Sequence, residues 1–470
     1  MSEKNKLVWF RNDLRAGDNA ALYRACEGGG QVIAVALISP AQWVLQDESK
    51  SRVQFWLANL AKLKEQLAAL NIPLKVLTVA DNSAVPSALA ELAASLDISE
   101  LYFNREYPEY EQRRDEQLEQ LLARRGVVCT SFDSDVVFAP GTILNKQQQP
   151  YKVFTPFAKA WRYQFTLTMP APLPLPKKQM ASTIKSDAIP KAIAYPIKTG
   201  ADYDSERWPP GSEAAHGQLQ QFVHERVFDY GGDRDVPAVP GTSALSPYLS
   251  VGALSVRQCV AALQNAMPGD AWLASQWLTE LIWREFYRHL LVAFPQMNRW
   301  QPFREEVERR IVWQPDQRLF KAWCEGETGF AIVDAGMKQL LETGWMHNRL
   351  RMVTASFLSK LLRQDWRQGA RFFMRHLIDG DFASNLGGWQ WCASVGADAA
   401  PYFRIFNPAR QAQRFDPHGL YVAKWLPELA DLGISAHQND LFTTATGRPP
   451  PIINYSEARA RSLESYKNQS

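Results

Sequence analysis

The first 133 residues alternate short apolar runs with longer amphipathic stretches. The amphipathic stretches, residues 51–70, 84–96 and 109–125, repeat apolar positions at helical spacing. The apolar runs are rich in Val, Leu and aromatic residues, as buried strands are, and cover residues 7–10, 31–39, 73–79, 100–104 and 127–132. This alternation predicts a Rossmann-like α/β domain over residues 1–133, with a parallel five-stranded sheet and helices on both faces.

A glycine-rich phosphate loop is missing from this predicted domain. Its glycine run, Gly28-Gly29-Gly30, precedes a predicted strand instead of opening a helix. An NAD-type site is therefore not expected there.

The pattern changes twice after the predicted sheet. Residues 134–210 lose their periodicity, concentrate prolines at 170–176 and predict a long linker with one short helix at 154–165. Residues 211–470 then form a series of helical patterns, which predicts an all-α domain. Its clearest helical stretches are 272–294, 329–343, 345–362 and 367–378.

Composition narrows the class of protein. The chain is 46% hydrophobic and 21% charged, as soluble globular proteins are, and no apolar run approaches the length of a membrane helix. No secretory signal opens the sequence, and its five cysteines are scattered. We therefore expect a cytoplasmic protein with reduced thiols.

The charge is small overall but unevenly placed. The net charge is +3, and between residues 141 and 200 Lys and Arg outnumber Asp and Glu by eight. Binding to nucleic acid would therefore use a local patch.

Tryptophan is unusually frequent in the predicted helical domain. The chain has 16 tryptophans, and 12 of them follow residue 200. They either fill a large core or take part in chemistry, and composition does not decide between these alternatives.

Residues 277–290, WLTELIWREFYRHL, place unusual side chains on one helix face. Glu280, Trp283, Arg284 and Tyr287 fall at positions i, i+3, i+4 and i+7. A carboxylate, an indole and a guanidinium on an apolar face must be paired or face a cavity. The alternative is a structural Arg–Glu pair.

Three further stretches carry candidate chemistry. Residues 344–352, GWMHNRLRM, would place Trp345, Asn348, Arg349 and Met352 on one helix face, with partners for phosphates or ring edges. Residues 377–394 combine two aspartates, an amide, Gly387-Gly388 and two indoles, which suits a polycyclic ligand; the carboxylate spacing does not fit a calcium loop, and no metal is expected. Residues 402–414 interleave basic and aromatic side chains, as a phosphate-tracking edge does.

Together these runs resemble a known family. WLTELIWREFYRHL, GWMHNRLRM, DGDFASNLGGWQW and the N-terminal LVWFRNDLR are similar, in order and separation, to the class I cyclobutane pyrimidine dimer DNA photolyases of the photolyase/cryptochrome family. The resemblance implies an α/β antenna domain (1–133), a linker (134–210) and a helical domain (211–470) that binds FAD and DNA. It also implies a monomeric carbon–carbon lyase that repairs pyrimidine dimers in light.

The resemblance implies a set of flavin-binding residues. These are Tyr230, Thr242, Ser243, Ala244, Leu245 and Ser246 around the phosphates and ribityl chain, and Asn348, Arg351, Asp379, Gly380, Asp381 and Asn385 around the rings. Asn385 matches the residue opposite flavin N5, where an amide tunes how the cofactor holds its electrons.

The resemblance also implies a lesion site. Because the dimer cannot react inside the base stack, photolyases flip it out. Glu280 matches the carboxyl that stabilises the reduced dimer electrostatically. The implied DNA-binding residues are Arg234, Trp283, Arg284, Asn348, Arg349, Met352, Trp391, Arg404 and Gln411.

Reduced FAD in this family gives one electron to the dimer in near-UV or blue light and regains it after the ring opens. Trp389, Trp366 and Trp313 match the chain that carries electrons inward when oxidised flavin is photoreduced. A methenyltetrahydrofolate antenna would use Tyr110, Glu111 and Arg299, where folate-binding relatives have Asn, Glu and Lys. A deazaflavin, or no second chromophore, remains an alternative.

Two other functions share this scaffold. A cryptochrome would sense blue light, but this chain shows no long tail after the helical domain, and its complete lesion set favours repair. A photolyase for (6-4) photoproducts uses a histidine pair where this chain has Asn348 and Met352.

Overall fold

The N-terminal part contains the predicted parallel sheet. In a computed structural model that describes residues 4–190, 199–437 and 447–467, five strands pair in the order β3-β2-β1-β4-β5, all parallel. The strands are β1 Asn5–Phe10, β2 Val32–Ile38, β3 Leu74–Thr78, β4 Ile98–Asn104 and β5 Val128–Phe132. The five strands match the predicted runs, and the fold class is confirmed.

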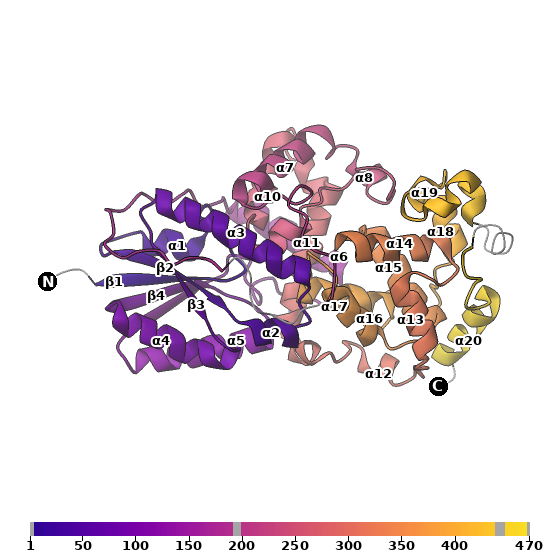
Figure 1. The fold of residues 1–470 in the computed structure, drawn as a ribbon, viewed down its shortest axis with the longest axis horizontal. Helices are drawn as coiled ribbons and strands as arrows, with labels where there is room; N and C mark the ends of the chain where they lie inside the picture. The colour runs from indigo at the N-terminus through magenta and orange to yellow at the C-terminus, as the bar shows by residue number, and fades with distance from the viewer. Residues whose placement is uncertain (1–3, 191–198, 438–446, 468–470) are drawn as a thin grey trace.

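Helices cover both faces of the sheet, so both faces are buried. Successive side chains of a strand point to opposite faces. Leu7 and Trp9 of β1 pack towards α4 and α5, whereas Val8 and Phe10 pack towards α1 and α3. Figure 1 shows the two helix layers on either side of the sheet. These helices are α1 Ala20–Ala25, α2 Pro40–Leu45, α3 Lys50–Ala69, α4 Val85–Ser95 and α5 Glu109–Ala123.

The periodicity identified α3, α4 and α5 but not α1 and α2. Each of the missed helices has six residues, which is less than two turns and too short to show a 3.6-residue period. Asn19 caps α1 by accepting from the Leu22 amide at 3.0 Å, a local signal that an apolar pattern does not contain.

The predicted linker packs along both parts of the molecule. Its helix, α6 Phe154–Thr168, contacts α11 of the helical part. Further along, the Asp18 amide donates to the Leu173 carbonyl at 3.0 Å, and the Gln179 side chain bonds both N–H and C=O of Val32. The segment is therefore held by hydrogen bonds to the α/β part.

The C-terminal part is helical, as predicted (Figure 1). Its helices are α7 Ser212–Glu225, α8 Tyr230–Asp233, α9 Ser246–Val251, α10 Val256–Ala266, α11 Gln276–Ala293, α12 Glu305–Glu308, α13 Gln317–Glu325, α14 Ala331–Thr343, α15 Asn348–Ser356, α16 Trp366–Met374, α17 Phe382–Cys392, α18 Pro408–Phe415, α19 Leu420–Trp425 and α20 Tyr455–Lys467.

Two predicted helices begin three or more residues later than expected, and a third, 367–378, ends earlier, at Met374. The pattern over 272–294 contains a 3₁₀ turn and then α11, which begins after Ser275, whose hydroxyl accepts from the Trp277 amide. The pattern over 345–362 becomes α15 followed by a π-helical turn, Phe357–Leu361. Apolar periodicity continued through both caps and so placed these starts too early.

Residues near the ends of β1 and α3 join the two parts. Arg52 Nε donates to the Gly380 carbonyl at 2.7 Å, and Arg15 Nη1 donates to the Gly252 carbonyl at 3.0 Å. Gly252 has φ +70°, and a Cβ there would lie 2.1 Å from the Asn12 carbonyl oxygen, so only glycine permits this approach. The carboxyl end of the sheet therefore faces the helical part directly.

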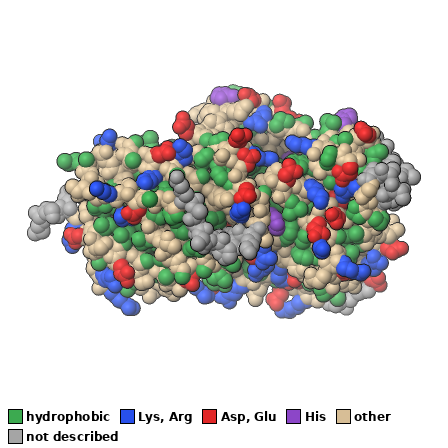
Figure 2. All heavy atoms as spheres, in the orientation of Figure 1, with side chains coloured by type: hydrophobic (Ala, Val, Ile, Leu, Met, Phe, Trp, Pro, Cys, Tyr) green, Lys and Arg blue, Asp and Glu red, His purple; other side chains and the backbone are tan. Residues whose placement is uncertain are grey.

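On the face drawn in Figure 2, acidic and basic side chains are mixed. Among the described residues no helix is both long and apolar enough to cross a membrane. All five cysteines are unpaired.

Candidate active site

A cavity of ≈ 550 Å³ lies among α8, α9, α11, α15 and α17. Its size is that of ligand pockets in general. The structure brings 15 of the predicted site residues to its wall: Tyr230, Arg234, Ser243, Ser246, Glu280, Trp283, Arg284, Asn348, Arg351, Met352, Asp379, Asp381, Asn385, Trp389 and Trp391.

Helix α11 supplies the face expected from its spacing. Glu280, Trp283, Arg284 and Tyr287 all line the cavity, while the opposite face, with Phe286, is buried in the core. The expected alternative of a structural pair between Arg284 and Glu280 does not occur. Arg284 instead ion-pairs with Asp135 and donates to its carbonyl at 2.7 Å.

Glu280 is held by two partners from different elements. Its Oε1 atom accepts hydrogen bonds from Arg234 Nη1, beside α8, and from Gln276 Nε2 at 2.9 Å, one turn earlier on α11. The Glu280 side chain is 28% exposed. It therefore stands oriented at the cavity and open to a further donor.

Two indoles form aromatic walls of the cavity. Trp283 stacks on Phe154 of α6, with ring centroids 3.6 Å apart and planes 8° from parallel. Trp391 on α17 is likewise partly buried and lines the same space. Their side chains are thus available to a flat ligand, which stacks favourably on such rings.

Aspartates and arginines form the polar end of the cavity. Asp379 Oδ2 accepts from Arg351 Nη2 at 2.7 Å and from Ser246 Oγ at 2.6 Å, but its buried Oδ1 atom has no partner in the structure. Burial alone would raise the pKa of Asp381, yet Arg288 and Arg284 hold that pKa well below its usual range. Asp381 is therefore a carboxylate at neutral pH.

Asp381 also explains why α17 begins where it does. Its Oδ1 atom accepts from the Ser384 amide at 2.8 Å, an N-cap. One turn later, Asn385 Nδ2 donates to the Ala370 carbonyl at 2.9 Å, which fixes the amide beside the cavity.

The start of α15 corrects one predicted face. Trp345 precedes the helix, which His347 caps by accepting from the Arg349 amide at 3.2 Å through Nδ1. Trp345 therefore does not share a helix face with Asn348, and its Nε1 donates to Ser246 Oγ at 3.4 Å. Asn348 and Met352 do line the cavity.

The paired glycines of α17 have different roles. A Cβ on Gly387 would lie 2.2 Å from the Tyr287 ring, so this glycine lets α17 pack closely on α11. A Cβ on Gly388 would meet no atom within 4 Å, because Gly388 faces the cavity. The sequence predicted that the backbone approaches a neighbouring group closely at these glycines. At Gly387 that group is a side chain of the protein, the Tyr287 ring.

The three tryptophans of the expected electron chain occupy different depths. Trp389 lines the cavity and is 2% exposed, Trp366 is fully buried and Trp313 is partly exposed. Helices α16 and α17, which carry Trp366 and Trp389, pack together. Trp366 Nε1 donates to Glu308 Oε1 at 2.8 Å.

The remaining predicted residues lie outside this cavity wall. Arg349 pairs with Asp235 at 2.6 Å, Arg404 is exposed, and Gln411 is partly buried with an unpartnered Oε1. Gly380 lines a second cavity. The cavity wall also excludes Thr242, Ala244 and Leu245, which lie in the loop before α9.

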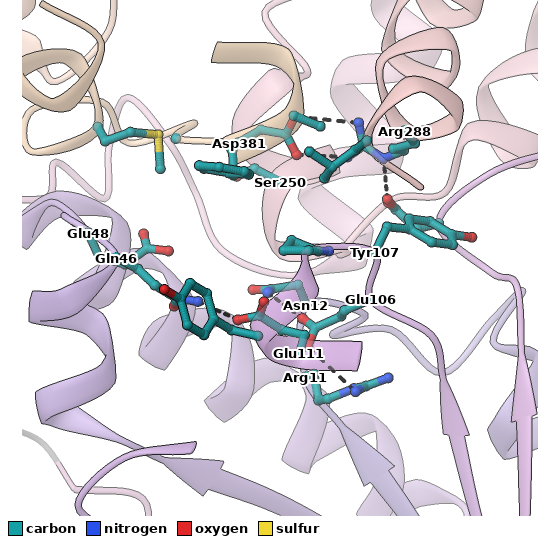
Figure 3. A pocket seen from close by; sticks show the side chains of 18 of the residues that line it. Arg11, Asn12, Gln46, Glu48, Glu106, Tyr107, Glu111, Ser250, Arg288 and Asp381 are labelled. Carbon is teal, nitrogen blue, oxygen red and sulfur yellow. Dashed lines mark hydrogen bonds and ion pairs between the residues drawn. The ribbon is translucent and has the colours of Figure 1, made fainter. Parts of the chain in front are cut away.

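The second cavity, of ≈ 180 Å³, lies between the two parts of the molecule. It opens at the carboxyl ends of β1 and β4, where the strand order reverses and open α/β sheets bind ligands. Figure 3 shows Arg288 and Asp381 on one side and Glu111 on the other.

One residue at the wall of this second cavity has an unpaired carboxylate oxygen. Glu111 Oε2 is buried without a partner, whereas the Arg11 guanidinium, whose Nε and Nη2 atoms also lack one, packs over the Trp9 and Phe103 rings. Burial and the neighbouring Glu106 raise the pKa of Glu111 to about 7. Tyr110 joins Glu111 at the wall, but Arg299 does not: its guanidinium ion-pairs with Glu109 at 2.8 Å, and Asn298 lines the cavity instead.

Several cavity residues were not predicted. Trp277 and Gln276 stand one turn before Glu280 on α11, so extending the same face back by one turn would have found them. Phe373 and Cys392 also line the cavity but carry no sequence signal distinct from core residues. Within residues 4–190, 199–437 and 447–467, no group of three His, Cys, Asp or Glu residues is placed to hold a metal ion.

Comparison with known proteins places this geometry in a family. Residues 6–177 match the family model described as DNA photolyase, and residues 277–468 match the FAD binding domain of DNA photolyase. The chain is 43% identical to the deoxyribodipyrimidine photo-lyase of Vibrio cholerae, over 98% of this chain and 99% of that protein. It is also 43% identical to the enzyme of that name from Escherichia coli, over 98% of each.

Solved structures agree with this assignment. A class III photolyase from Agrobacterium tumefaciens superposes with a TM-score of 0.88 at 33% identity, over 99% of this chain and 98% of that one. A Synechocystis cryptochrome superposes with a TM-score of 0.82 at 26% identity, over 99% of each. With two family models and full-length relatives in agreement, the chain belongs to the DNA photolyase family.

Proposed function

We propose that this protein is a light-dependent lyase that splits cyclobutane pyrimidine dimers in DNA. One observation carries the proposal: the lesion set Glu280, Trp283, Asn348, Met352 and Trp391 lines one continuous cavity together with eight of the twelve predicted flavin-binding residues. Electron transfer falls steeply with distance, so a donor and its substrate must share such a space.

The residues at the polar end fit FAD. The buried Asp379 Oδ1 without a partner is suited to a ligand N–H or hydroxyl group, and Gly388 leaves open space elsewhere on the same cavity wall. Tyr230, Ser243 and Ser246 would hold the phosphates and ribityl chain, and Asn348, Arg351, Asp381 and Asn385 would border the rings. When bound and reduced, FAD supplies an electron in near-UV or blue light.

The protein's own residues would select and hold the flipped dimer. Trp283 and Trp391 would flank its two rings, because stacking recovers part of the energy lost on unstacking the bases. Arg349 and Arg404 would contact phosphates around the site, and Arg234, Arg284 and Gln411 would support that surface. Glu280 would accept a hydrogen bond from an N–H group at the pyrimidine edge, and the guanidinium of Arg234, which Glu280 holds at the cavity, would stabilise the negative charge on the reduced dimer.

Glu280 gives a first test of this arrangement. Glu280→Gln keeps the shape but removes the charge, and Glu280→Ala removes the side chain. Both are expected to lower repair per absorbed photon by roughly fivefold, the effect of about 1 kcal/mol from one lost hydrogen bond. The measurements are quantum yield with pre-reduced enzyme and affinity for dimer-containing DNA. A defect in affinity alone would refute the proposed role.

The cryptochrome alternative is less well supported. The cryptochrome neighbour shares the fold at 26% identity, whereas the photo-lyase relatives share 43%. The deciding experiment is illumination of a dimer-containing oligonucleotide with the purified protein, with a dark control. We expect restored thymines only in the light; bound flavin without any repair would favour a photoreceptor.

We propose that a second chromophore occupies the cavity between the two parts of the molecule, with Tyr110 and Glu111 at its wall. The buried unpartnered Oε2 atom of Glu111 supports a ligand there. A folate and a deazaflavin both remain candidates, and Arg299 would act only from outside this wall.

Glu111→Ala tests this second site. We expect it to lower the content of the second chromophore, measured by absorbance and mass spectrometry of the released compounds, while FAD content stays constant. Full retention of the second chromophore would place it elsewhere.

We further propose that the protein acts as a cytoplasmic monomer. Its five unpaired cysteines are in keeping with a reducing compartment.

A further inference from the structure

A buried lysine lies behind the basic and aromatic loop near the large cavity. Lys360 is in the π-helical turn Phe357–Leu361 and is 0% exposed. Its Nζ atom donates to the carbonyls of Arg404 at 3.0 Å and Pro401 at 3.5 Å. The side chain therefore reaches from the π turn to the backbone of the loop, and such turns are frequent at functional sites.

Lys360 is a costly residue for packing alone. Burying an ammonium group is unfavourable unless it is paired, and here its partners are neutral carbonyls. Burial lowers the pKa of Lys360 to about 8; the charged or titratable neighbours that act on it are Cys392 and Arg404. A methionine would fill the same volume, so the ammonium is best explained by the two carbonyls that it holds.

The loop that Lys360 holds points its side chains outwards beside the large cavity. Tyr402, Phe403 and Arg404 are exposed, at 37% and 60% for the two aromatic residues. The loop is tied to the cavity wall, because the Ala400 amide donates to the carbonyl of Trp391 at 3.3 Å. A shift of this turn would therefore move the exposed side chains relative to the cavity mouth.

We propose that Lys360 is a positioning residue for damaged-DNA binding: its ammonium fixes the turn 401–404 so that Arg404 meets a backbone phosphate next to the cavity. Lys360 itself touches no DNA. This inference rests on the proposed repair function, but its structural half can be tested without DNA.

The test compares Lys360→Met with Ser359→Ala in the flavin-loaded protein. Ser359 is a matched control, because it is buried in the same turn and its hydroxyl donates only to the Ala355 carbonyl at 2.7 Å. Hydrogen–deuterium exchange of residues 399–406 should rise in Lys360→Met and stay unchanged in Ser359→Ala. Equal exchange in all three proteins would overturn the proposal, whatever the substrate is.

DNA binding gives the second readout. Lys360→Met should weaken binding to dimer-containing duplex roughly fivefold. It should also reduce the salt slope of log K by about one, as loss of one phosphate contact does. Repair per absorbed photon at saturating DNA should not change. Unaltered affinity alongside raised exchange would refute the DNA-binding role.

A double-mutant cycle separates positioning from general loosening. If Lys360 acts through the loop, Lys360→Met should add no further loss of affinity in an Arg404→Ala background. Additive losses would contradict the proposal. If the methionine variant does not fold, Lys360→Gln, which keeps an N–H donor, serves in the same cycle with a smaller expected loss. Failure of the wild-type protein to bind dimer DNA would instead count against the proposed function.

Discussion

Trp389→Phe is expected to block photoreduction of oxidised flavin while sparing repair by pre-reduced enzyme. The indole lines the large cavity and is 2% exposed, and we propose it as the residue that gives the first electron to an excited flavin there. Phenylalanine is much harder to oxidise, and we expect the photoreduction rate to fall at least about a hundredfold, as about 2.7 kcal/mol of added barrier would produce. Transient absorption and steady-state bleaching of the oxidised flavin measure this rate.

The control for this variant is another buried indole. Trp272→Phe changes a tryptophan that packs against Phe165, with centroids 5.2 Å apart, and does not line the cavity. It should leave photoreduction unchanged. If Trp389→Phe abolishes repair by pre-reduced enzyme as well, Trp389 is a structural residue and the proposed electron chain is wrong.

Gly387→Ala is expected to destabilise the helical part by about 3 kcal/mol, at the upper end of overpacking costs. The added methyl group would lie 2.2 Å from two carbons of the Tyr287 ring, so α11 and α17 would have to separate. The midpoint of denaturant-induced loss of helical circular dichroism, measured on cofactor-free protein, reports this change. Cofactor is left out because a ligand adds stability of its own.

The adjacent glycine provides the matched control. Gly388→Ala adds the same methyl group where no atom lies within 4 Å and improves helix propensity, so apoprotein stability should be unchanged or up to about 1 kcal/mol higher. The same methyl group points into the cavity and should weaken flavin binding. Equal destabilisation by both alanines would contradict the different roles assigned to these glycines.

Much of this architecture could be predicted because it depends on local periodicity. The alternation of Leu7, Val8 and Trp9 between two buried faces specifies a strand in a covered parallel sheet. The same reasoning placed Glu280 and Trp283 on one face of α11, and the structure confirms that they meet at one cavity. A local pattern predicts a strand or a helix face reliably when consecutive residues of the chain lie in different environments.

The remainder depends on contacts between distant residues. Neither the pairing of Glu280 with Arg234 nor that of Arg299 with Glu109 follows from spacing, because each joins separate elements. The start of α15 depends on the His347 cap, a side-chain hydrogen bond that does not affect the apolar pattern. The cavity between the parts could not be predicted, because its wall forms only when both parts are folded and docked.

Where the two parts of the molecule dock, the two cavities share a wall. Arg284, Asp381 and Ser250 line both cavities, and Asp135 and Arg288 complete the ion pairs around them. A substitution in this shared wall would alter the electric field in both cavities at once. If a second chromophore occupies the smaller cavity, as proposed, a substitution of Arg288 would shift the absorption of both chromophores together, and the spectrum of each would report on the protein environment of the other.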